Sequence, residues 1–155
     1  AEGMRTCNPE GPLLVYVARM VPTREKGRFY ALGRIFSGKI SQGQKVRILG
    51  PNYRLNLKDD LFIKFVQQVM MPTSSSVVCV ESLGAGNFCL LAGIDQYLVN
   101  RGTLTSDESS SPIITPLVGK KMPAAKYAVQ PQNPRDLPAL MEGLKYMQKW
   151  GDPSV

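Results

Sequence analysis

The stretch GRFYALGRIFSGKISQGQKVRI, residues 27–48, decides the fold because it alternates short β-rich runs with glycines. Its first run, Phe29 to Phe36, is aromatic and β-branched and contains Gly33. A glycine inside a strand usually marks a bulge or a close backbone approach. In its last run, Lys45 to Ile48, polar and apolar residues alternate as in a half-buried strand. The stretch therefore predicts two strands joined through a glycine-bounded turn.

Similar runs recur on both sides of this stretch and predict further strands. They lie at Leu13–Ala18, Leu61–Met71, Phe88–Ala92 and Thr103–Thr105. The run from Leu61 is long enough to bend or to split. Many short strands with Gly and Pro turns and no helix between them are typical of an all-β barrel or sandwich.

The character of the sequence changes after about residue 106. Residues 106–112 are polar and low in complexity, which predicts a loop or a linker between domains. Tyr127–Gln130 then predicts one strand, and an N-cap at Asp136 predicts an amphipathic helix that ends at Gly151. The apolar stripe of that helix is Leu137, Leu140, Met141, Leu144 and Met147. Because such a stripe needs a sheet to pack against, we expect the sequence to be cut inside a second domain.

Basic charge is concentrated in the first third of the chain. The 155 residues carry a formal net charge of +7. Residues 1–54 hold ten basic side chains and three acidic ones, whereas residues 55–155 hold nine of each. A one-sided excess of this kind indicates a polyanionic partner, and nucleic acid before a membrane surface.

Composition excludes several classes of site. The chain has no histidine, which excludes Ser–His–Asp and Cys–His catalysis and His-bearing zinc sites. Its three cysteines, Cys7, Cys79 and Cys89, lack C-x-x-C spacing, so we expect small buried hydrophobes in a reducing compartment. No apolar run approaches the length of a membrane span. We therefore expect a cytoplasmic protein with no membrane partner.

Two glycine motifs resemble nucleotide-binding loops without their chemistry. Gly33–Ile40 nearly matches G-x-x-x-x-G-K-[ST], but Ile40 stands where the Mg²⁺-binding hydroxyl is needed and no amphipathic helix follows. Gly84-Ala85-Gly86 is two thirds of G-x-G-x-x-G, with Cys89 at the third glycine position. We interpret the first as a strand with its turn and the second as a turn. We expect no enzyme activity, catalytic residue, metal or cofactor in this chain.

The glycine and apolar positions of residues 27–48 resemble the second domain of translational GTPases. They are Gly27-Arg28, Gly33-Arg34-Ile35, Gly38, Ile40, Gly43, Val46 and Ile48. Longer matches resemble the eukaryotic elongation factor 2 family, namely Met20–Thr23, Lys26–Ala31, Phe36–Gly38, Gly50–Tyr53, Gly93–Val99, Asn133-Pro134, Asp136–Pro138 and Glu142–Lys145. The resemblance is strong over about 7–69, 93–105 and 131–149, and weak over 70–92 and 106–126.

The resemblance implies a mainly β fold in three parts. Residues 1–12, in which prolines and glycines cluster without periodicity, are interpreted as a linker or a remnant. By the resemblance, 13–118 would be a translation-factor-type β-barrel, and 119–155 the opening strand and helix of an α+β domain. The parent would be a GTPase that drives translocation in protein synthesis, with GTP and Mg²⁺ held by a domain preceding Ala1. This chain would be its ribosome-binding and interdomain-coupling module, a monomer whose partners are the ribosome, small-subunit ribosomal RNA and that GTP-binding domain.

Basic side chains are the best candidates for contact with RNA or the ribosome. They are Arg24, Lys26, Arg28, Lys45 and Arg47. Lys45 and Arg47 project from one strand face while Val46 and Ile48 fill the other. Arg34 and Asp95 are candidates for interdomain contact. For Asp95 a hydrogen-bonding turn role is the stronger interpretation. For Arg34 an ion pair or an interdomain contact is as well supported as contact with RNA.

Other interpretations of the chain stay open. The basic residues could be solvated surface charge. The chain could also be the RNA-binding barrel of a ribosome-maturation or spliceosomal relative, or a free-standing RNA-binding barrel whose helix packs within the same chain.

Overall fold

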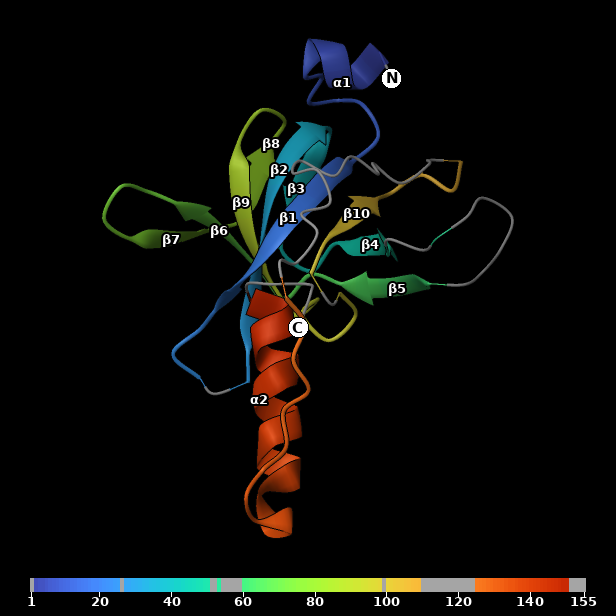
Figure 1. The fold of residues 1–155 in the computed structure, drawn as a ribbon. Coiled ribbons are helices and arrows are strands. Elements are labelled where there is room, and N and C mark those ends of the chain that lie inside the picture. Colours follow the sequence, from blue (N-terminus) through green and yellow to red (C-terminus); the bar gives the residue numbers. More distant parts are fainter. Residues whose placement is uncertain are drawn as a thin grey trace. The chain divides into compact units, whose positions relative to one another are not determined.

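The structure is a computed structural model (Figure 1) that describes residues 2–25, 27–50, 53, 60–98, 100–109 and 125–150. The chain forms two compact units, Ala1–Ile114 and Thr115–Val155. Three predicted features lie outside the described residues: the candidate site residue Lys26, the domain boundary at 118/119 and the helix end at Gly151.

The first unit consists of a short helix followed by strands, which confirms the prediction of a mainly β fold. Its elements are α1 (Glu2–Thr6), β1 (Leu14–Pro22), β2 (Phe29–Ser37), β3 (Lys39–Ser41), β4 (Lys45–Leu49), β5 (Leu61–Phe65), β6 (Gln68–Pro72), β7 (Val77–Val80), β8 (Ser82–Gly84), β9 (Phe88–Ala92) and β10 (Gly102–Thr105). The long run from Leu61 does split, into β5 and β6. The sequence did not predict the short strands β3, β7 and β8.

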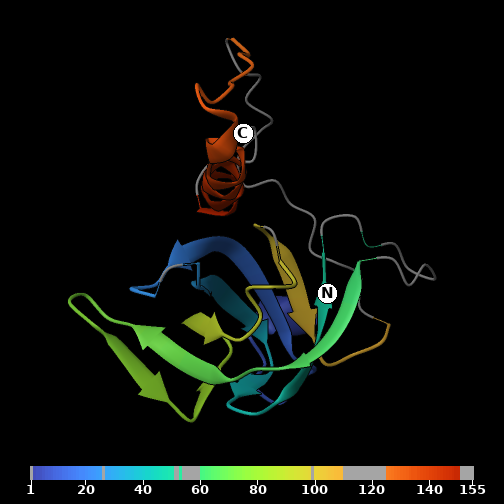
Figure 2. The same ribbon diagram turned by 90° about the horizontal axis from the view of Figure 1, so that it is seen from below.

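The strands form two antiparallel sheets. The larger has the order β5-β4-β10-β1-β2-β9-β6-β7, and the smaller pairs β3 with β8. Among the described strands, no ladder joins the two ends of the larger sheet. However, β5 and β6 follow each other in one curved path, visible in Figure 2, with β5 paired to β4 and β6 paired to β9.

The bend between β5 and β6 is held by backbone hydrogen bonds to both of its neighbours. The N–H of Val66 donates to the carbonyl of Gln44 at 3.0 Å, and the N–H of Gly43 donates to the carbonyl of Val66 at 2.8 Å. One residue later, the N–H of Gln67 donates to the carbonyl of Ala92 at 3.0 Å. Two consecutive residues therefore carry the chain from the β4 side of the sheet to the β9 side.

The core centres on one row of side chains that crosses four strands. Ile48 pairs with Leu104, Leu104 with Val15, and Val15 with Ile35. All four side chains are fully buried. Since burying one such side chain is worth about 1.5–3 kcal/mol, this row is a main source of the stability of the sheet.

A β-bulge interrupts the pairing of β1 with β2. Val17 pairs with Gly33 and Arg19 pairs with Leu32, so Ala18 is the extra residue on β1. A Cβ atom on Gly33 would lie 2.7 Å from the carbonyl oxygen of Tyr16. The predicted close backbone approach at Gly33 is therefore confirmed.

Two predictions of local structure were wrong. Residues 2–6, expected within a linker, form α1, and the N–H of Gly38 donates to the carbonyl of Asn8 at 2.8 Å, which holds the segment after α1 against the end of β2. Tyr127–Gln130, expected as a strand, has no regular structure, and Tyr127 is 87% exposed. A strand needs a ladder partner, and the part of the second unit that the structure describes provides none.

In the second unit the predicted amphipathic helix is confirmed. A 3₁₀ turn, η1 (Pro134–Asp136), leads directly into α2 (Leu137–Trp150), with Pro138 in the first turn. Its apolar residues Leu137, Met141 and Met147 are exposed. Neither helix in the described part of the chain is long and apolar enough to cross a membrane.

Replacing Gly33 with Ala should destabilise the sheet, because the new Cβ would collide with the backbone of β1. We expect the free energy of unfolding, measured by urea denaturation, to fall by about 1–3 kcal/mol. Gly84 on β8 is the matched control, since nothing lies within 4 Å of a Cβ there. Gly84→Ala should stay within about 0.5 kcal/mol of the parent. Equal stability of the two variants would contradict the close approach at Gly33.

Candidate nucleic-acid interface

Two of the predicted contact residues lie side by side on β4. Lys45 is exposed and Arg47 partly so, while Val46 and Ile48 between and after them are buried. The predicted division of β4 into a basic face and a core face is confirmed.

The registers of the ladders place a further basic residue on the same side of the sheet, beyond Thr105 and Tyr16, which are buried. Antiparallel partners point to the same side, so Arg47 shares its side with Thr105 and, through Thr105, with Leu14. Tyr16, two residues along β1, pairs with Arg34 on β2. Arg34 therefore lies on the same side of the sheet as Lys45 and Arg47, and it is exposed.

Arg19 also lies on this side, which the local sequence pattern did not predict. Strict alternation would place Arg19 with the buried Val15 and Val17. The bulge at Ala18 shifts the alternation, so that Met20 is buried and Arg19, opposite Leu32, is exposed. We call Arg19, Arg34, Lys45 and Arg47 together the basic face. The signal in the sequence was Gly33, which marks the bulge on the neighbouring strand.

Members of the basic face differ in whether their charge is already paired with a carboxylate. The Nη1 of Arg47 donates a hydrogen bond to Oε1 of Glu108 and forms an ion pair with it, and only 18% of the Arg47 side chain is exposed. Lys45 forms no ion pair with the residues that the structure describes. Lys45 is therefore more available to an anionic ligand than Arg47.

Arg34 lies against two aromatic rings. Its guanidinium carbon is 5.6 Å from the ring centroid of Phe36 and 5.7 Å from that of Phe88. Phe88 is the partner of Arg34 in the β2–β9 ladder and is exposed. Cation–π contacts at exposed sites contribute about 0.5–1 kcal/mol each and orient the guanidinium without neutralising it. The predicted interdomain role of Arg34 stays a prediction.

The loop between β1 and β2 is shaped by its own hydrogen bonds. The N–H of Thr23 donates to the carbonyl of Arg28 at 3.0 Å, and the N–H of Arg28 donates to the carbonyl of Glu25 at 3.2 Å. The hydroxyl oxygen of Thr23 accepts from the N–H of Glu25 at 3.2 Å. Arg24 is exposed in this loop.

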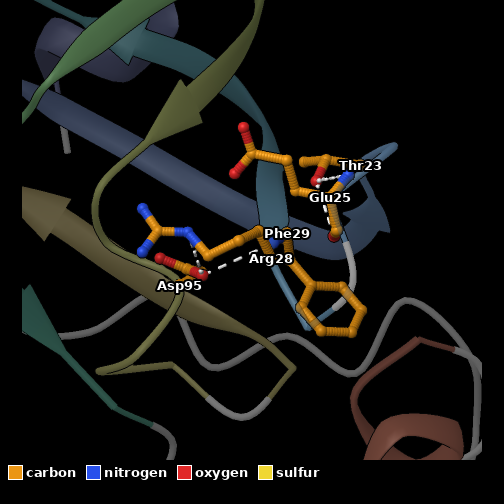
Figure 3. Close-up of polar contacts among 5 residues, drawn as sticks. All are labelled: Thr23, Glu25, Arg28, Phe29 and Asp95. Atoms are coloured by element: carbon orange, nitrogen blue, oxygen red, sulfur yellow. Dashed lines mark hydrogen bonds and ion pairs between the residues drawn. The ribbon is translucent and has the colours of Figure 1, made fainter.

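A buried carboxylate fixes the end of this loop. Figure 3 shows Asp95 directed at both Arg28 and the backbone of Phe29. Its Oδ2 lies 3.7 Å from Nε of Arg28 and accepts a hydrogen bond from the N–H of Phe29 at 3.4 Å. The Asp95 residue is only 2% exposed, whereas 43% of the Arg28 side chain is exposed.

The pair of Arg28 with Asp95 was not predicted. Asp95 lies in a turn after β9, as expected, and its carboxylate also accepts a hydrogen bond from Phe29, 66 positions earlier in the chain. Both residues belong to the first compact unit. The predicted roles of Arg28 in RNA contact and Asp95 in interdomain contact stay predictions.

The cysteines fall into two groups. Cys89 is buried, and burial raises the pKa of its thiol to about 12. The thiol donates a hydrogen bond to the carbonyl of Gly33 at 3.6 Å. Cys7 and Cys79 are exposed, so the expectation of buried cysteines holds for Cys89 alone.

The chemistry of the basic face suits binding. It combines guanidinium and ammonium groups with an exposed aromatic ring, which are the groups that contact phosphates and bases. In the described part of the chain, no group of three His, Cys, Asp or Glu residues is placed to hold a metal ion. A search against models of known protein families finds no match to this chain.

Asp95→Ala should destabilise the first unit more than Arg28→Ala does. The first variant removes a buried acceptor of the Phe29 amide hydrogen, which costs about 1–3 kcal/mol. The second removes a partly exposed ion-pair partner and should cost less than about 1 kcal/mol. Urea denaturation of both single variants and the double variant checks this order. A larger loss for Arg28→Ala would show that the charge, not the amide hydrogen bond, holds the loop.

A thiol reagent at pH 8 should label Cys7 and Cys79 rapidly and Cys89 only after unfolding in urea, because Cys89 is a buried thiol there. The same burial makes the free energy of unfolding depend on pH. Since the pKa of Cys89 is raised from 9.0 to about 12, its contribution to the free energy of unfolding is complete below pH 9. That contribution should be lost as the pH rises toward 12. Rapid native labelling of all three cysteines would contradict the burial of Cys89.

Proposed function

We propose that this chain is the ribosome-binding and interdomain-coupling module of an elongation-factor-2-like GTPase acting in translocation. The observation that carries the proposal is the basic face, in which side chains of β1, β2 and β4 point to one side of the sheet. The motifs that resemble translational GTPases, given above for residues 7–69, 93–105 and 131–149, support the choice of parent.

The large sheet, in this proposal, is a translation-factor-type barrel. The bend at Val66 and Gln67 supports it, because it links the β4 side of the sheet to the β9 side by backbone hydrogen bonds. A barrel presents its outward side chains on a curved, rigid surface, which suits recognition of RNA by shape and phosphate spacing. The helix α2 then belongs to the next domain of the parent.

Ribosomal RNA is the partner that this face suits best. Each phosphate that a Lys or Arg neutralises releases condensed counterions, so binding is strong at low salt and weakens as salt rises. Arg19, Arg34 and Lys45 form no ion pair with the residues that the structure describes. Three outward cations on one curved surface can therefore follow an RNA backbone.

The parent, not this chain, would bind GTP and Mg²⁺, through a separate GTP-binding domain. The proposal accordingly assigns no GTP hydrolysis to this chain alone.

Binding to isolated small ribosomal subunits as a function of salt tests the proposal. The double variant Arg19→Ala/Lys45→Ala should bind more weakly. The decrease of log K with log salt should become less steep by about 2, because two phosphate contacts are lost. Arg47 is left unchanged because its substitution would also release Glu108. The control is Lys39→Ala, an exposed lysine on β3 in the smaller sheet. An unchanged slope for the double variant, or no binding by the unsubstituted chain at low salt, would contradict the proposal.

A further inference from the structure

An exposed aromatic side chain stands directly opposite the available lysine of the basic face. In the β4–β5 ladder, Lys45 pairs with Phe65 and Arg47 pairs with Ile63. Directly opposed residues of an antiparallel pair point to the same side, with Cβ atoms about 4.5–5.5 Å apart. Phe65 is 62% exposed and Ile63 is 45% exposed. Both apolar side chains therefore lie on the basic face, next to its cations.

Among the described residues, Phe65 and the other aromatic residue of its strand, Phe62, have different ring contacts. Phe62 points to the other side of β5, where its ring lies 5.4 Å from that of Tyr97. Lys64 covers the same Tyr97 ring at 4.6 Å. Among the residues that the structure describes, no ring or cation packs on Phe65 in this way. Its ring therefore offers an open aromatic surface beside an ammonium group.

We propose that Phe65 is a stacking platform for an unpaired base of single-stranded RNA, whose phosphate is bound by Lys45. This inference rests on the proposed RNA-binding function and specifies which form of RNA the face takes. Every base has a flat π-face that can stack on an aromatic ring, so the platform is tolerant of sequence. The short distance between the opposed side chains lets one nucleotide contact both.

Charge complementarity favours RNA over an apolar protein surface as the occupant. Lys45 stands directly opposite Phe65, Arg19 and Arg34 lie on the same side of the sheet on β1 and β2, and the acidic Glu108 is bound to Arg47. Lysine is depleted from the centres of protein–protein interfaces, whereas cations interleaved with aromatic rings are typical of single-strand binding. A duplex is disfavoured because its paired and stacked bases cannot lie on the ring.

The test compares a 12-nucleotide single-stranded RNA with a duplex of the same length, by fluorescence anisotropy at two salt concentrations. Phe65→Leu should lower the affinity for the single strand about tenfold, leave the duplex affinity unchanged and leave the salt slope unchanged. Phe65→Trp should restore binding. In a chain whose only tryptophan, Trp150, is replaced by Phe, the fluorescence of Phe65→Trp should be quenched by the bound single strand. Phe62→Leu, on the other side of β5, is the matched control and should bind as the parent does.

The outcomes separate this inference from the proposed function. If Lys45→Ala weakens RNA binding and Phe65→Leu does not, the stacking platform is overturned and the basic face stands. If the unsubstituted chain binds neither RNA at low salt, the stacking platform and the proposed function both fail. Equal losses on single strand and duplex would assign Phe65 a structural role and overturn the platform. If Phe65→Leu binds RNA as before but no longer binds intact small ribosomal subunits, the stacking platform is overturned in favour of a contact between Phe65 and a protein.

Discussion

The arrangement of the first unit depends on the backbone hydrogen bonds at Val66 and Gln67. There the chain leaves its pairing with the β4 side and begins its pairing with Ala92 on β9. Val66 is fully buried, so a polar or larger side chain at the bend would disturb both halves of the sheet at once. Because the bend fixes where β5 ends, it also fixes the register that sets Phe65 opposite Lys45. A constraint on packing thus determines which side chains meet on the surface.

The bulge at Ala18 has the complementary effect on the other side of the basic face. It lets β1 keep Val15, Val17 and Met20 in the core while Arg19 turns outward. Next to this bulge the backbones of β1 and β2 approach closely, and Gly33 permits that approach because it has no Cβ. Backbone geometry therefore determines on which side of the sheet the basic residues of the first third of the chain lie. The strands β1, β2 and β4 each contribute basic residues to the same side.

Local patterns in the sequence predicted the parts of this structure that have local causes. The alternation from Lys45 to Ile48 gave the correct faces of β4, and the helical stripe gave α2. The ion pairs of Arg28 with Asp95 and of Arg47 with Glu108 join residues far apart in the sequence, which no local pattern reveals. The strand predicted at Tyr127–Gln130 is absent for a related reason. A strand forms only when another strand pairs with it, and the local composition does not show whether one does. The β-branched run Val77–Val80 was a usable signal for β7 that the sequence analysis overlooked.

The central claim is that one face of the sheet, not the chain's charge as a whole, meets RNA. Titration of the ¹⁵N-labelled chain with single-stranded RNA, followed by NMR chemical shifts at low and moderate salt, tests it most directly. The account predicts salt-sensitive shifts concentrated at Arg19, Arg34, Lys45 and Phe65, with little change in β7 and α2. Shifts spread evenly over all exposed lysines and arginines, or concentrated in α2, would contradict it.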